Sequence, residues 1–116
     1  MNVMDEKDFA YRHGTHGPKY LMKGPESNFG IIRLLPGEIT REHVHRVMEE
    51  NFYVLEGTVE IAAGGGKAVL TPGQFAHIGP GEAHTLRNIG SAAARLVLTA
   101  APFCDGDKYS PEGQKL

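Results

Sequence analysis

Two histidines separated by a single residue, His43 and His45, are the side chains of this chain best placed for chemistry, and Glu50 follows five residues after His45. Side chains at positions i and i+2 of a β-strand point to the same face of the strand, so the two imidazoles can approach one ion together. A nearby carboxylate and a third imidazole, His84, can complete the surroundings of a divalent cation. The first hypothesis is therefore a metal site. The alternative is that these histidines are ordinary core or turn residues.

The rest of the chain indicates how such residues would be positioned. Fifteen glycines and seven prolines fall mostly between short apolar runs, which indicates strands joined by tight turns. Several short strands separated by turn residues about every ten positions are typical of an all-β sandwich or barrel. The expected strands are residues 29–35, 51–55, 58–62, 67–70, 74–78, 84–88 and 94–100.

Composition limits the possible functions. The chain has 116 residues and a formal net charge of -2, with no basic run that could follow a phosphate backbone, so nucleic acid is not expected as a partner. The N-terminal residues carry charges where a signal peptide needs an apolar core, and no apolar stretch is long enough to span a membrane. The expected location is the cytoplasm. The single cysteine, Cys104, cannot form an intramolecular disulfide.

We expect one domain over residues 1–116, with an N-terminal arm at 1–28, a barrel at 29–101 and a C-terminal tail at 102–116. Two predicted strands are apolar on both faces, at residues 52–55 and 96–98, which suggests a cover on each side. A second subunit would provide the outer cover and make a homodimer. Alternatively, the N-terminal arm folds over this outer face.

Spacing around the histidine pair resembles the two motifs of the cupin superfamily. The first motif spans residues 37–57, ends in a Tyr-Val-Leu-Glu-Gly-Thr run at 53–58, and is carried by Gly37, His43, His45, Glu50 and Gly57. The second motif spans residues 73–88 and is carried by Gly73, Gly79, Gly81, His84 and Asn88. The chain departs from the family at Gly79, where proline is usual, although Pro80 follows directly.

The resemblance implies an all-β, single-domain double-stranded β-helix, the jelly-roll barrel of cupins. It also implies that the metal ligands are His43, His45, Glu50 and His84. Such a ligand set suits one divalent transition metal, either Fe, Mn, Ni, Cu or Zn. The leading interpretation is a metal-dependent enzyme, a dioxygenase or an isomerase or lyase, acting on a small oxygenated or carboxylated substrate. The alternatives are a non-catalytic protein that binds a sugar or small acid, and a metal that only stabilises the fold.

Other side chains are candidates for roles around the metal. His77 is a possible acid or base and Arg33 a possible partner of a substrate carboxylate or phosphate, and each is alternatively an exposed surface residue. Phe52 and Val54 share strand parity with Glu50 and are expected to line the cavity, whereas Tyr53 is expected at an interface. In the tail, which resembles extensions of small cupins that cross the barrel mouth, Phe103 could act as a lid. Asp105 or Asp107 could transfer protons, or both could simply be solvated.

Overall fold

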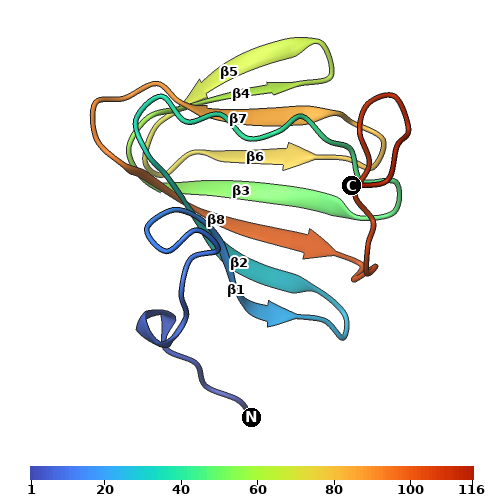
Figure 1. Cartoon of the computed structure of the whole chain (residues 1–116), viewed down its shortest axis with the longest axis horizontal. Coiled ribbons are helices and arrows are strands. Elements are labelled where there is room, and N and C mark those ends of the chain that lie inside the picture. The colour runs from blue at the N-terminus through green and yellow to red at the C-terminus, as the bar shows by residue number, and fades with distance from the viewer.

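The computed structural model describes residues 1–116 and consists almost entirely of antiparallel β-structure (Figure 1). A short 3-10 helix, η1 (Glu6–Asp8), precedes eight strands. The strands are β1 (Gly17–Lys23), β2 (Asn28–Leu34), β3 (Glu49–Glu56), β4 (Val59–Ala63), β5 (Gly66–Leu70), β6 (Phe75–Ile78), β7 (His84–Asn88) and β8 (Ala94–Ala101). All seven expected strands are present. No helix has the length and apolar character needed to cross a membrane.

Two sheets form the layers of the fold. The larger has five strands in the order β1-β2-β8-β3-β6, and the smaller has three in the order β5-β4-β7. The residues that face inward from both sheets form a cluster of twelve buried side chains, among them Phe52, Val54, Leu86, Leu96 and Leu98. This two-layer arrangement is the predicted all-β jelly roll.

Strand β1 is the element that the sequence prediction missed. Residues 17–23 were expected within the N-terminal arm, but they pair with β2 from Gly17↔Arg33 to Lys23↔Asn28. The strand lacks a clear alternation of apolar and polar residues, and Gly17 and Pro18 at its start are typical of turns. Strand β1 lies at the edge of the sheet and pairs with one neighbour, β2. This pairing outweighs the weak preference of its own residues for a β-strand.

The segment between β2 and β3 extends the smaller sheet although it is not a continuous strand. It runs antiparallel along β7, with bridges at Ile39↔Arg87 and His43↔His84 and a hydrogen bond from Thr40 N to Leu86 O of 2.9 Å. This pairing places residue 43 directly beside residue 84, so the two halves of the predicted site meet through the backbone.

A turn at Gly57 lets the chain pass from the larger sheet to the smaller one. Its φ is +88°, which side chains other than glycine rarely adopt, and a Cβ placed there would lie 2.8 Å from both Cα and Cβ of Ala94. The conformation and the close approach to β8 therefore both require glycine. This glycine closes the first motif predicted from the sequence.

Candidate metal centre

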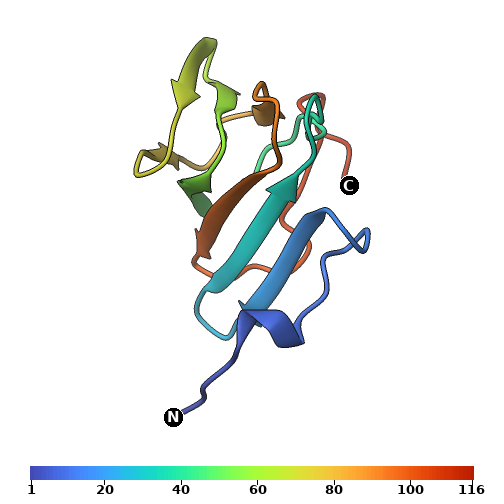
Figure 2. The ribbon, with the colours of Figure 1, turned by 90° about the vertical axis from the view of Figure 1, so that its left-hand side faces the viewer.

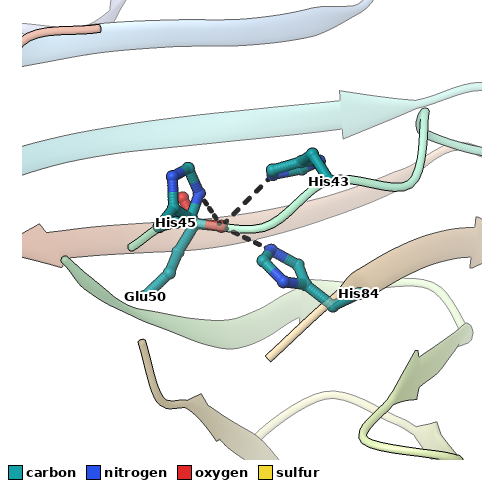
Figure 3. A group of neighbouring side chains, drawn as sticks. All are labelled: His43, His45, Glu50 and His84. Carbon is teal, nitrogen blue, oxygen red and sulfur yellow. Dashed lines mark hydrogen bonds and ion pairs between the residues drawn. The ribbon is translucent and has the colours of Figure 1, made fainter. Parts of the chain in front are cut away.

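The four predicted metal ligands converge in space (Figure 3). His43 and His45 come from the segment that precedes β3, Glu50 lies at the start of β3, and His84 begins β7. One potential ligand atom from each residue lies within 4.8 Å of all the others. The Glu50 Oε1 atom is 3.0 Å from His84 Nε2, 3.4 Å from His45 Nε2 and 3.9 Å from His43 Nε2.

All three imidazoles are oriented by a backbone carbonyl at Nδ1. His43 Nδ1 lies 2.8 Å from Arg41 O, and His84 Nδ1 lies 2.9 Å from Glu82 O. His45 Nδ1 lies 2.5 Å from Asp107 O in the C-terminal tail. A carbonyl can only accept a hydrogen bond, so each Nδ1 carries a proton, and a ring in its neutral form presents the lone pair of Nε2 to the cluster.

This chemistry fits a bound cation. The cluster brings together four hydrogen-bond acceptors, namely three Nε2 lone pairs and one carboxylate oxygen. No donor lies between them unless one of the rings is doubly protonated. His45 Nε2 is buried and has no hydrogen-bond partner. Buried polar atoms normally have a partner, and a divalent transition metal would satisfy all four atoms at once.

The charge states of Glu50 and His43 agree with this interpretation, whereas the raised pKa of His45 favours a proton that a metal would have to displace. Burial alone would raise the pKa of Glu50, but the neighbouring His45 and His84 rings lower it to about 2, so the carboxylate is ionised at neutral pH. Burial lowers the pKa of His43 to about 4, which keeps this ring neutral and free to act as a ligand. At His45 burial lowers the pKa, but Glu50 and Asp107 outweigh it and leave the pKa raised, because their negative charge and acceptor oxygens favour a proton there.

The cluster forms the floor of a cavity of about 510 Å³. The apolar walls come from the inward faces of both sheets and include Ile32, Leu34, Phe52, Leu86 and Leu98. Of the two side chains expected to line this space, Phe52 does so and Val54 is instead fully buried in the core below. A small organic molecule could therefore reach the ligand atoms in a space lined by both apolar and polar side chains.

Part of the cavity wall is the C-terminal tail. Val44 and Tyr109 exchange backbone hydrogen bonds of 2.8 and 3.0 Å, and the ring of Phe103 packs on Gly24 while lining the cavity. The Asp107 carboxylate is buried and accepts hydrogen bonds from the backbone N–H groups of Arg46, Val47 and Met48 at 2.8, 2.9 and 2.9 Å. Asp107 therefore fixes the chain between His45 and Glu50. Neither of the roles expected for it, proton transfer or simple solvation, matches this placement.

The two candidate catalytic residues lie away from the cluster. His77 is exposed, with Nδ1 2.7 Å from Asn51 Oδ1 and 3.4 Å from Glu49 Oε2. Its neighbour Ile78 pairs with inward-facing Glu50, so the alternation along β6 directs His77 outward. Arg33 donates from Nη1 to Thr15 O at 2.6 Å and does not line the cavity.

Several cavity residues were not singled out from the sequence. Arg12, Tyr20, Arg41 and Lys108 all line the cavity. Arg12 and Tyr20 belong to the residues expected to form the N-terminal arm, and Lys108 to the C-terminal tail. Their positions depend on long-range pairing of these segments, for which the sequence has no local signal.

Comparison with known proteins agrees with the fold. The family model described as "Cupin domain" matches residues 30–100. "Tetracenomycin polyketide synthase protein TcmJ" of Streptomyces glaucescens is 31% identical over 81 residues, covering 69% of this chain and 54% of TcmJ. The chain thus spans little more than half the length of the curated relatives that it matches.

Two crystal structures match over nearly the full chain. TT1209 from Thermus thermophilus has a TM-score of 0.77 and 30% identity, covering 88% of this chain and 98% of TT1209. A conserved protein with a double-stranded β-helix domain from Klebsiella pneumoniae has a TM-score of 0.78 and 21% identity, covering 91% of this chain and 94% of its own. The first supports relationship at the sequence level, and the second shows the shared fold.

Proposed function

Because this chain belongs to the cupin family, we propose that it is a metal-dependent enzyme that uses one divalent transition metal, held by His43, His45, Glu50 and His84. Its substrate is a small oxygenated or carboxylated molecule, and its reaction is that of a dioxygenase or of an isomerase or lyase. The observation that carries this proposal is the convergence of four acceptor atoms, one of them buried and without a partner, on the floor of an open cavity.

An open cavity beside the ligand atoms favours an enzyme over a purely structural metal. Structural sites are usually closed by protein ligands, whereas catalytic sites keep positions for water or substrate. A divalent metal here would supply Lewis-acid polarisation of a substrate oxygen, or a place for dioxygen to bind. The chain itself orients the three imidazoles through the backbone carbonyls of Arg41, Glu82 and Asp107, and lines part of the cavity with apolar side chains.

The named relative is consistent with an oxygen-rich substrate. TcmJ is described as a polyketide synthase protein, and polyketides carry many closely spaced oxygen atoms that can bind a metal in pairs. The match covers about half of TcmJ, so it supports the class of substrate and does not identify one.

The proposal is tested by loading the purified chain with Fe(II), Mn(II), Ni(II), Cu(II) or Zn(II) under anaerobic conditions. Small hydroxy acids, keto acids and polyphenols are then screened by oxygen electrode and by mass spectrometry. Turnover with oxygen uptake identifies a dioxygenase, and turnover without it identifies an isomerase or lyase. Turnover should be lost in Glu50→Gln and retained in Glu49→Gln, the matched change one residue earlier on the outer face.

A non-catalytic binding protein is the alternative, and the same screen separates it. Saturable ligand binding without any chemical change, or tight binding that survives removal of the metal, would favour a binding role. Turnover that survives Glu50→Gln would contradict the assignment of this site.

We also propose that the chain forms a homodimer through the outer face of the larger sheet. Tyr53 and Phe75 are cross-strand partners on this face and are 42% and 59% exposed. The N-terminal segment covers a different part of the face, where Arg95 pairs with Glu6 and Lys19 Nζ donates to Glu6 O. Analytical ultracentrifugation should show a dimer that dissociates in Tyr53→Glu but not in Val69→Glu, an exposed position on the smaller sheet.

A further inference from the structure

Three cationic side chains from distant parts of the sequence line the cavity that contains the metal centre. Arg12 belongs to the turn before β1, Arg41 lies two residues before His43, and Lys108 follows Asp107 in the tail. In Figure 2 the C-terminal tail (red) and the segment between β2 and β3 (green-blue) lie together near the top of the view, and the loop before β1 (blue) lies beside that strand. Residues 12, 41 and 108 all line the cavity.

The positive charges of these side chains are not neutralised by ion pairs. The lysine and arginine ion pairs of the structure involve Lys7 and Arg95 instead. Arg12 and Arg41 are exposed and Lys108 is partly buried, and like charges near one another repel unless a negative charge is also present. Burial lowers the pKa of Lys108, and the nearby charges of Arg12 and Arg41 lower it further against the attraction of Glu50.

The acidic side chains of the cavity mostly have other partners. Glu50 lies in the metal cluster, and the Asp107 carboxylate accepts three backbone hydrogen bonds. Glu38 accepts a hydrogen bond from Leu35 N and lies 3.8 Å from His16. Asp105 is exposed and forms no ion pair. Arg12, Arg41 and Lys108 therefore line the cavity without a carboxylate partner in an ion pair.

We propose that the ligand of this cavity carries a carboxylate or phosphate group that binds Arg12, Arg41 and Lys108, while the rest of the molecule extends to the metal centre. Arginine and lysine form strong charge-assisted hydrogen bonds with both groups. This inference rests on the proposed function and narrows its substrates to anions. The positive charges of Arg12, Arg41 and Lys108 select the substrate in this proposal. The four metal ligands alone would bind neutral and anionic substrates alike.

The test uses the full chain freed of metal, so that an anion cannot bind through the metal. Inorganic phosphate and succinate are titrated separately and followed by amide NMR shifts. We expect saturable binding with a dissociation constant in the millimolar range or tighter, with shifts centred on residues 12, 41 and 108. Each of Arg12→Gln, Arg41→Gln and Lys108→Gln should weaken binding by about 5- to 10-fold, the loss of one charge-assisted hydrogen bond. The tighter of the two probes identifies the group that the ligand carries.

Arg87→Gln is the matched control, because Arg87 is exposed on β7 and does not line the cavity. It should bind both probes as the unchanged chain does. A triple variant combines Arg12→Gln, Arg41→Gln and Lys108→Gln. The proposal is overturned if neither anion binds at about 20 mM, a concentration far above a millimolar dissociation constant. It is also overturned if the triple variant binds the anions as well as the Arg87→Gln control does. Metal uptake, measured separately on the same variants, should be unchanged, so failure of anion binding and failure of the metal centre give different results.

Discussion

Replacing Asp107 by alanine should weaken both the fold and the metal centre, because this one side chain organises the segment between two ligands. Its carboxylate accepts three backbone hydrogen bonds, and its carbonyl accepts one from His45 Nδ1. A buried donor left without a partner costs about 1–3 kcal/mol. The N–H of Met48 is buried, while those of Arg46 and Val47 are partly buried and can bind water instead. We therefore expect Asp107→Ala to lower the free energy of unfolding by about 2–4 kcal/mol.

Metal affinity should fall in the same variant. The carbonyl that orients His45 remains in the backbone but loses the side chain that anchors it, and loss of such outer contacts typically weakens metal binding by about 10- to 100-fold. Chemical denaturation measures the stability, and calorimetric titration with Zn(II) measures the affinity. Asp107→Asn retains a single acceptor oxygen and should fall between alanine and the unchanged chain.

Lowering the pH should remove the contribution of Asp107 to the free energy of unfolding. Burial would raise the pKa of this carboxyl, but the three N–H groups outweigh it and lower the pKa below its ordinary value of 3.8. A lowered pKa stabilises the folded state above the ordinary value, and that contribution is lost as the pH falls through the folded-state pKa. The stability difference between the unchanged chain and Asp107→Ala should therefore be constant from about pH 7 to 5 and shrink below about pH 4.

Asp105→Ala is the control for these measurements, because Asp105 lies in the same tail but is exposed. It should change stability by less than about 0.5 kcal/mol, as surface substitutions usually do. If Asp107→Ala behaved like Asp105→Ala in both stability and Zn(II) affinity, the tail would not be part of the metal centre and this reasoning would be refuted.

Three further predictions follow from individual residues. Metal affinity should increase as the pH rises through and above the ordinary histidine pKa of 6.5, because a metal must displace the proton that the raised pKa of His45 favours. Calorimetric titration at several pH values measures this, and an affinity that does not change with pH would contradict it. Gly57→Ala should destabilise the fold by more than about 1 kcal/mol, since it adds a Cβ 2.8 Å from Ala94 in a backbone with φ +88°, and an unchanged denaturation midpoint would refute the close approach. His77→Gln should leave metal binding and turnover unchanged because His77 is exposed on the outer face, and a large loss of either would show a role that its position does not explain.

The sequence predicted those features of the molecule that have a local signal. Strand positions followed from apolar runs bounded by glycine and proline, and the spacing of His43, His45 and Glu50 predicted three side chains that do converge. The inner and outer faces of β3 were also predictable, because alternation along a strand fixes them: Phe52 lines the cavity and Tyr53 is exposed.

Features that depend on long-range contacts could not be predicted in this way. His77 could face either way until the register of β6 against β3 was known, since a shift of one residue reverses the face. Nothing near Asp107 in the sequence indicates that it would meet residues 46–48, about sixty positions earlier. Arg12 and Lys108 likewise reach the cavity only because the turn before β1 and the C-terminal tail both line it.

The central claim is that His43, His45, Glu50 and His84 together hold one divalent metal ion, and elemental analysis tests it most directly. The chain is purified without added metal, and its content is compared with that of His84→Ala and of His77→Ala, a histidine outside the cluster. The account predicts about one transition-metal ion per chain in the unchanged protein and in His77→Ala, and a large loss in His84→Ala. A protein that takes up no metal even when metal is supplied, or equal metal content in all three proteins, would contradict it.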